Sequence, residues 1–68
     1  MNKTLTLNGE PRGFTDGMSV ADLCRDIGLD PAKVAVERNL VIVPRSTFAG
    51  VMLTEGDALE IVHFVGGG

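Results

Sequence analysis

The chain has 68 residues, of which 44% are apolar and 22% are charged, so it is neither disordered nor long enough for more than one small domain. A domain of this size buries only about 60% of the surface that its unfolded chain exposes, which leaves no room for a large enclosed active site. Nine acidic and six basic residues give a net charge of −3, and the basic residues are scattered, which argues against nucleic acid as a partner.

The cysteine content and the lack of long apolar segments bear on the cellular compartment. Cys24 is the only cysteine, which excludes an internal disulfide and a multi-cysteine zinc site and suits a reducing compartment. The first residues lack the apolar run of a signal peptide, and no segment approaches the about 20 consecutive apolar residues that a membrane span needs. We therefore expect a cytoplasmic protein with no membrane partner and no bound metal.

The first elements in chain order are two strands joined by a tight turn. Leucine alternates with threonine over residues 4–7, which is the period of a β-strand. Asn8-Gly9 follows directly and predicts a β-hairpin, because both central turn positions need a positive φ. The return strand is expected over residues 10–14, and its proline and glycine favour an edge position.

A helix is expected after a second turn at Asp16-Gly17. Ser19 is a suitable N-cap, and Asp22 lies three residues on as the acidic member of a capping box. Four apolar residues then share one stripe of the helix, namely Val20, Leu23, Cys24 and Ile27. Gly28 is suited to follow the helix, and Pro31 prevents its continuation.

Two further strands are predicted in the middle of the chain. Residues 34–37 form the first strand, Arg38-Asn39 the turn, and residues 40–43 the second strand, which Pro44 ends. Residues 46–50 form an irregular connection with a short 3₁₀ turn around Phe48.

The last strand is expected over residues 58–65, after a turn at residues 55–57. Its two faces alternate: Leu59, Ile61, His63 and Val65 on one, and Ala58, Glu60, Val62 and Phe64 on the other.

A single helix can cover only one face of such a sheet, which indicates an α+β domain. If the last strand lies beside and parallel to the first, a mixed sheet of about five strands packs on one helix, the β-grasp (ubiquitin-like) fold. We expect this domain over residues 1–65, followed by a flexible glycine tail, residues 66–68.

The side chains do not predict a catalytic or metal site. His63 is the only histidine, and zinc needs three or four ligands, so we interpret it as a surface residue near the strand end. Cys24 lies on the apolar stripe of the helix, where a thiol is inert. Asp22, Asp26 and Asp30 lie on successive helical turns and indicate a solvated face.

The remaining feature is the glycine run Gly66, Gly67 and Gly68. It is either a plain flexible end or a main-chain extension whose terminal carboxylate reacts. Glycine suits the second role, because a residue without Cβ passes through a channel that excludes side chains and adds no bulk beside the carboxylate. Three residues reach roughly 10 Å beyond the domain, far enough to enter the site of another protein.

The order of elements and the glycine ending together resemble the ubiquitin-like sulfur carriers, and within them the thiamine-pathway sulfur carrier family (ThiS). The resemblance covers the whole chain: Asn8-Gly9, Ser19, residues 34–37, Asn39, Ile42-Val43-Pro44-Arg45, Gly56-Asp57, residues 59–62 and Gly67-Gly68. The discriminating segments are Asn39 to Arg45 and Gly56 to Gly68. One departure is Leu40-Val41, where family members more often carry polar or glycine residues, and this adds exposed apolar surface.

The resemblance implies a substrate of other enzymes and not a catalyst. A ThiF-like adenylating enzyme, using ATP and Mg²⁺, would activate the carboxylate of Gly68. A sulfur donor such as a cysteine desulfurase would then supply sulfur for a C-terminal 1-thioglycine, the thiocarboxylate, and thiazole synthase (ThiG) would use that sulfur. Beyond this modification, no bound cofactor is implied.

The partner-docking surface is expected on the open face of the last strand, at Glu60, Val62 and Phe64, where exposed apolar side chains beside the tail would anchor a partner. Three other functions stay open. They are the small subunit of molybdopterin synthase, a ubiquitin-like modifier joined to lysines, and a β-grasp binding module whose tail is inert.

Overall fold

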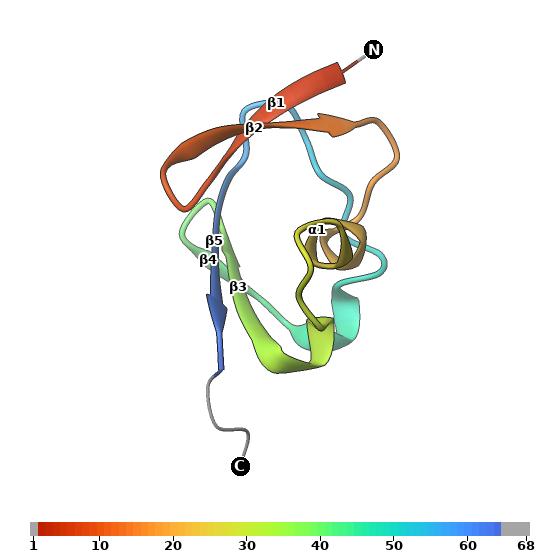
Figure 1. The fold of residues 1–68 in the computed structure, drawn as a ribbon, viewed down its shortest axis with the longest axis vertical. Helices are drawn as coiled ribbons and strands as arrows, with labels where there is room; N and C mark the ends of the chain where they lie inside the picture. Colours follow the sequence, from red (N-terminus) through yellow and green to blue (C-terminus); the bar gives the residue numbers. More distant parts are fainter. Residues whose placement is uncertain (1, 65–68) are drawn as a thin grey trace.

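The computed structural model describes residues 2–64, which form a five-stranded sheet with a helix across one face (Figure 1). The elements are β1 (Asn2–Leu7), β2 (Glu10–Thr15), α1 (Val20–Asp26), the 3₁₀ helix η1 (Pro31–Lys33), β3 (Val34–Arg38), β4 (Val41–Val43), the 3₁₀ helix η2 (Arg45–Thr47) and β5 (Ala58–His63). The glycine tail and Val65, the predicted end of the last strand, lie outside the described residues.

The strand order is β2-β1-β5-β3-β4, so the last strand of the sequence is the central strand of the sheet. It pairs in parallel with β1 and antiparallel with β3. This mixed sheet confirms the predicted β-grasp arrangement. β2 is an edge strand, as its Pro11 and Gly13 predicted, because a proline cannot donate a hydrogen bond inside a sheet.

Local signals place the first turn and the helix where the sequence predicted them. Asn8 and Gly9 have φ values of 51° and 84°, as the turn of this hairpin requires. The Ser19 hydroxyl accepts a hydrogen bond from the Asp22 N–H at 3.1 Å, and the Asp22 carboxylate accepts one from the Ser19 N–H at 3.0 Å. This reciprocal pair is the predicted capping box. Gly28 follows the helix with a φ of 83°.

The core lies between α1 and the sheet. Its fully buried members come from the helix stripe and from the inward faces of three strands: Val20, Leu23, Cys24, Leu5, Val34, Val36 and Leu59. Phe48, directly after η2, is also buried and closes this core from the loop side. The apolar residues that alternate along the strands therefore lie on the face of the sheet that the helix covers, and the residues between them lie on the open face.

One predicted turn was wrong by one residue. The sequence pattern placed the turn at Arg38-Asn39 and a strand from Leu40, whereas Asn39 and Leu40 form the turn, with φ values of 53° and 69°, and β4 begins at Val41. Arg38 is opposite Val41 in the pairing of β3 with β4, which leaves Asn39 at the first turn position. Leu40 must then take the second position, although its apolar side chain is typical of a strand.

Candidate functional site

The predicted docking residues lie on and just after β5. Glu60 and Val62 alternate with the buried Leu59 and Ile61, so they face away from the helix. The Val62 side chain is 62% exposed, and that of Phe64 is 47% exposed. Glu60, Val62 and Phe64 thus form an exposed surface on and just after β5, which we call the docking surface after its predicted role. Gly66, Gly67 and Gly68 lie outside the described residues.

Two asparagine side chains, one from each hairpin turn, hold β5 in place. On the β1 side, the Asn8 amide accepts a hydrogen bond from the Ile61 N–H at 2.9 Å and donates one to the Ile61 carbonyl at 3.3 Å. On the β3 side, the Asn39 amide oxygen accepts one from the Ala58 N–H at 2.9 Å. The strand that carries the docking surface is therefore bound from both neighbours by side chains as well as by main-chain pairing.

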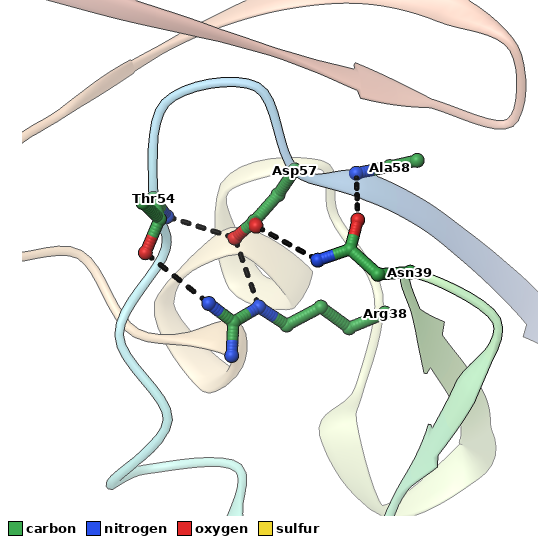
Figure 2. A network of polar contacts seen from close by, with 5 residues as sticks. All are labelled: Arg38, Asn39, Thr54, Asp57 and Ala58. Atoms are coloured by element: carbon green, nitrogen blue, oxygen red, sulfur yellow. Dashed lines mark hydrogen bonds and ion pairs between the residues drawn. The ribbon is translucent and has the colours of Figure 1, made fainter.

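Asp57 anchors the start of β5 (Figure 2). Its buried carboxylate accepts hydrogen bonds from Arg38 Nε at 2.9 Å, Asn39 Nδ2 at 3.1 Å and the Thr54 N–H at 2.8 Å. Burial acts to raise the pKa of Asp57, but the hydrogen bonds from Arg38, Thr54 and Asn39 together outweigh it and hold the pKa below its ordinary value. The sequence indicated only a turn here, because Arg38 and Asn39, at and just after the end of β3, are 19 and 18 residues away along the chain.

Phe64 is positioned by Arg45, a contact that sequence reasoning missed. The Arg45 guanidinium lies over the Phe64 ring, 5.8 Å from its centroid, and also donates to the Val34 carbonyl at 3.2 Å. The Phe64 N–H donates to the Lys33 carbonyl at 2.8 Å. The sequence marked Arg45 only as the last residue of the segment Asn39 to Arg45, which discriminates the family, and gave no indication that it contacts Phe64.

The other residues considered as chemical groups have structural roles. Cys24 is completely buried, and desolvation raises the pKa of its thiol, which keeps it protonated. His63 is exposed at the end of β5. The three predicted surface aspartates are exposed, and each has a hydrogen-bond partner: Asp22 in the capping box, Asp26 with Arg12 of β2, and Asp30, which lies beyond the end of α1, at the start of η1. Across residues 2–64, no three side chains of the metal-binding types lie close enough together to hold a metal ion.

The exposed apolar surface extends from β5 toward β4. Ile42, opposite Glu37 on the open face, is 67% exposed, whereas the exposed Leu40 lies in the turn and Val41 shares the face of buried Val43. Ile42 and Val62 line the same shallow hollow of about 190 Å³ on the open face of the sheet. The docking surface predicted from β5 alone is therefore part of a wider apolar area.

Comparison with known proteins identifies the family. Residues 5–68 match the model of the ThiS family. The chain belongs to the ThiS family. This confirms the resemblance to the thiamine-pathway sulfur carriers that the sequence motifs indicated.

The relatives of this ThiS-family chain include a sulfur carrier of nearly the same length and a much longer thiazole synthase. It is 40% identical over 65 residues to the sulfur carrier protein ThiS of Bacillus subtilis, covering 94% of this chain and 98% of that protein. It is 55% identical over 64 residues to a thiazole synthase of Paramagnetospirillum magneticum, covering 94% of this chain but only 20% of that protein. The chain thus spans about a fifth of the length of this thiazole synthase.

A solved structure agrees with the sequence relatives. The crystal structure of the thiamine biosynthesis protein ThiS from Geobacter metallireducens superposes with a TM-score of 0.73 at 35% sequence identity, and all of both chains is covered.

In the part of this ThiS-family chain that the structure describes, no helix is both long and apolar enough to cross a membrane.

Proposed function

We propose that this chain is a sulfur carrier of thiamine biosynthesis, acted on by enzymes and not itself an enzyme, and that its reactive group is the carboxylate of Gly68. The observation that carries the proposal is the match to the Bacillus subtilis sulfur carrier over 98% of that protein. A cytoplasmic location is part of the proposal, in keeping with the single buried thiol of Cys24.

The proposed chemistry takes place on the main chain. A carboxylate is a poor electrophile, so an adenylating enzyme of the ThiF type would first join Gly68 to AMP from ATP, with Mg²⁺ bound by that enzyme and pyrophosphate released. The persulfide sulfur of a donor such as a cysteine desulfurase would then displace AMP at the acyl carbon and form an acyl disulfide. A second thiol, supplied by the partner enzymes, would attack the donor's own sulfur, so that a disulfide forms on the donor side and the thiocarboxylate is released. The resulting thiocarboxylate would be the sulfur source for thiazole synthase. The thiazole synthase relative, in which the matched segment is a fifth of the protein, supports this partner.

Docking on these enzymes would use Glu60, Val62 and Phe64, with Gly66 and Gly67 delivering Gly68 into the partner's site. The main-chain and asparagine hydrogen bonds that flank β5 support this role, because a rigid strand loses little conformational freedom on binding. Phe64 lies two residues before Gly66 in the sequence, so a partner that holds its exposed ring would also fix where the tail begins.

Intact-mass spectrometry tests the reactive group. The chain is incubated with ATP, Mg²⁺, the adenylating enzyme and a sulfur donor, and we expect a mass gain equal to the replacement of one oxygen by sulfur. A variant without Gly68 should show no gain. A gain in that variant, or none in the full chain, would contradict the proposal.

The same reaction separates the alternative functions. Transfer of sulfur from the loaded chain to molybdopterin synthase instead of thiazole synthase would indicate the molybdopterin branch. Conjugates of higher mass on a denaturing gel would indicate a protein modifier. An activity that survives deletion of Gly67 and Gly68 would indicate a binding module.

Charged substitutions test the docking surface. Val62→Glu or Phe64→Glu should weaken binding to the adenylating enzyme and leave the thermal unfolding temperature nearly unchanged, because both side chains are exposed. Exposed Met52, which lies outside the docking surface, provides the matched control Met52→Glu. Equal losses of binding and thermal stability would count against this surface.

A further inference from the structure

Two glutamates face each other on the open side of the sheet. In the antiparallel pairing of β3 with β5, Glu37 stands directly opposite Glu60. Like charges in directly opposed positions of a sheet destabilise it, because their side chains are close neighbours. Glu37 and Glu60 therefore have an unfavourable arrangement in the free protein.

The basic residues of the protein do not relieve this repulsion. Among residues 2–64, no ion pair involves Glu37 or Glu60. Four of the six basic residues are engaged elsewhere: Lys3 with Asp16, Arg12 with Asp26, Arg38 with Asp57, and Arg45 with the Phe64 ring. The carboxylate pair is thus available to a cation from outside the domain.

The surroundings of the pair match a long side chain with a charged end. Glu37 is opposite Ile42 in the pairing of β3 with β4, and Ala35 is opposite Val62 in the pairing of β3 with β5. These residues line the hollow of about 190 Å³ together with Asn8. The hollow therefore has apolar walls beside two carboxylates, which suits an aliphatic stem that ends in a cation.

We propose that this hollow binds an arginine side chain of the adenylating enzyme, with the guanidinium between Glu37 and Glu60 and the stem against Ile42 and Val62. Arginine fits better than lysine, because its planar group carries five donors and can bond two carboxylates at once while packing its flat face on apolar atoms. The inference rests on the proposed function for the identity of the partner, and it adds the chemistry by which that partner is recognised.

The test measures binding of the full chain to the adenylating enzyme by calorimetry. Glu37→Gln and Glu60→Gln should each raise the Kd by about threefold, and the double variant should raise it by about tenfold. Wild-type binding should weaken as salt is raised, and the double variant should lose most of this dependence. Glu10→Gln removes the same charge from the exposed edge strand β2 and should leave the Kd unchanged.

Thermal unfolding shows whether the two glutamates act in partner binding or in the stability of the fold. Because the repulsion is relieved, Glu60→Gln should raise the Tm by about 2 °C while binding becomes weaker. A lower Tm would mean that the glutamates support the fold, and it would overturn the inference.

Binding and sulfur loading together separate this inference from the proposed function. Equal Kd values for the wild type, Glu10→Gln and the double variant, with the wild type loaded by sulfur, would overturn the inference alone. Charge-dependent binding without any sulfur gain in the wild type would overturn the proposed function alone. No binding by the wild type would overturn both.

Discussion

The side-chain amide of Asn8 makes hydrogen bonds to both main-chain groups of Ile61, 53 residues further along the chain. The parallel pairing of β1 with β5 covers Thr6 with Ala58 and Leu7 with Leu59, and at Asn8 the chain turns away with a φ of 51°. The amide thus continues the hydrogen bonding along β5 beyond the end of β1. The first turn of the chain and its last strand are directly coupled.

Asn8→Gly isolates the contribution of this amide, because glycine accepts the positive φ of the turn without strain. Loss of the two hydrogen bonds should lower the free energy of unfolding by about 2 kcal/mol, measured by urea denaturation. Asn2→Ala, at an exposed position of β1, should change it by less than about 0.5 kcal/mol. Equal effects of the two substitutions would show that the amide does not stabilise β5.

Asp57 should make the stability depend on pH in the acid range. Its pKa is held below the ordinary value in the folded chain, so its contribution is present above the unfolded pKa of about 3.9 and is lost as the pH falls through the lower folded pKa. Asp22, whose pKa is lowered first by the hydrogen bond from the Ser19 N–H, acts in the same direction.

Asp57→Asn should therefore reduce the loss of stability between pH 6 and pH 3 without abolishing it. At pH 7 the same variant should lower the free energy of unfolding by about 3 kcal/mol, because Arg38 then has no anionic partner. Urea denaturation at several pH values measures both effects. Asp16→Asn, which removes an exposed ion pair with Lys3, is the matched control and should change the stability at pH 7 by less than about 1 kcal/mol.

Leu40 adopts a φ of 69° with its side chain 87% exposed, so its conformation is strained and its burial contributes little. Leu40→Gly should raise the free energy of unfolding by about 0.5 to 1 kcal/mol, since glycine removes the clash of Cβ at positive φ. Leu40→Ala removes the exposed side chain but keeps Cβ and should give no such gain. Thermal unfolding of both variants measures the change in stability. Equal gains in stability for the two variants would show that backbone strain at Leu40 is not the cause.

The Cys24 thiol should not react in the native protein. It is fully buried and its pKa is raised by desolvation, so reaction with a thiol reagent should be slow in buffer and fast in urea. Cys24→Ala should cost about 1 kcal/mol of stability through the lost packing and should still gain sulfur at Gly68. Failure of this folded variant to gain sulfur would mean that the thiol takes part in loading.

The sequence by itself predicted the elements whose causes are local. Positive φ at Asn8-Gly9, the reciprocal bonds of Ser19 and Asp22, and the alternation along residues 58–63 each depend on residues only a few positions apart. The same alternation placed Glu60 and Val62 on the open face. The family followed from motifs spread over the whole chain, whereas the roles of Gly66, Gly67 and Gly68 remain predictions.

Only the tertiary structure decided the contacts of β5 with its neighbours. The bonds from Asn8 to Ile61 and the opposition of Glu37 to Glu60 depend on the register between strands that are distant in sequence. The placement of Leu40 in a turn depends on the register of β4 on β3. Register is set by which apolar faces are buried together against the helix, and that choice is made by the packing of the whole domain. A local pattern shows which way a side chain faces, but its partner is known only when the strands are in place.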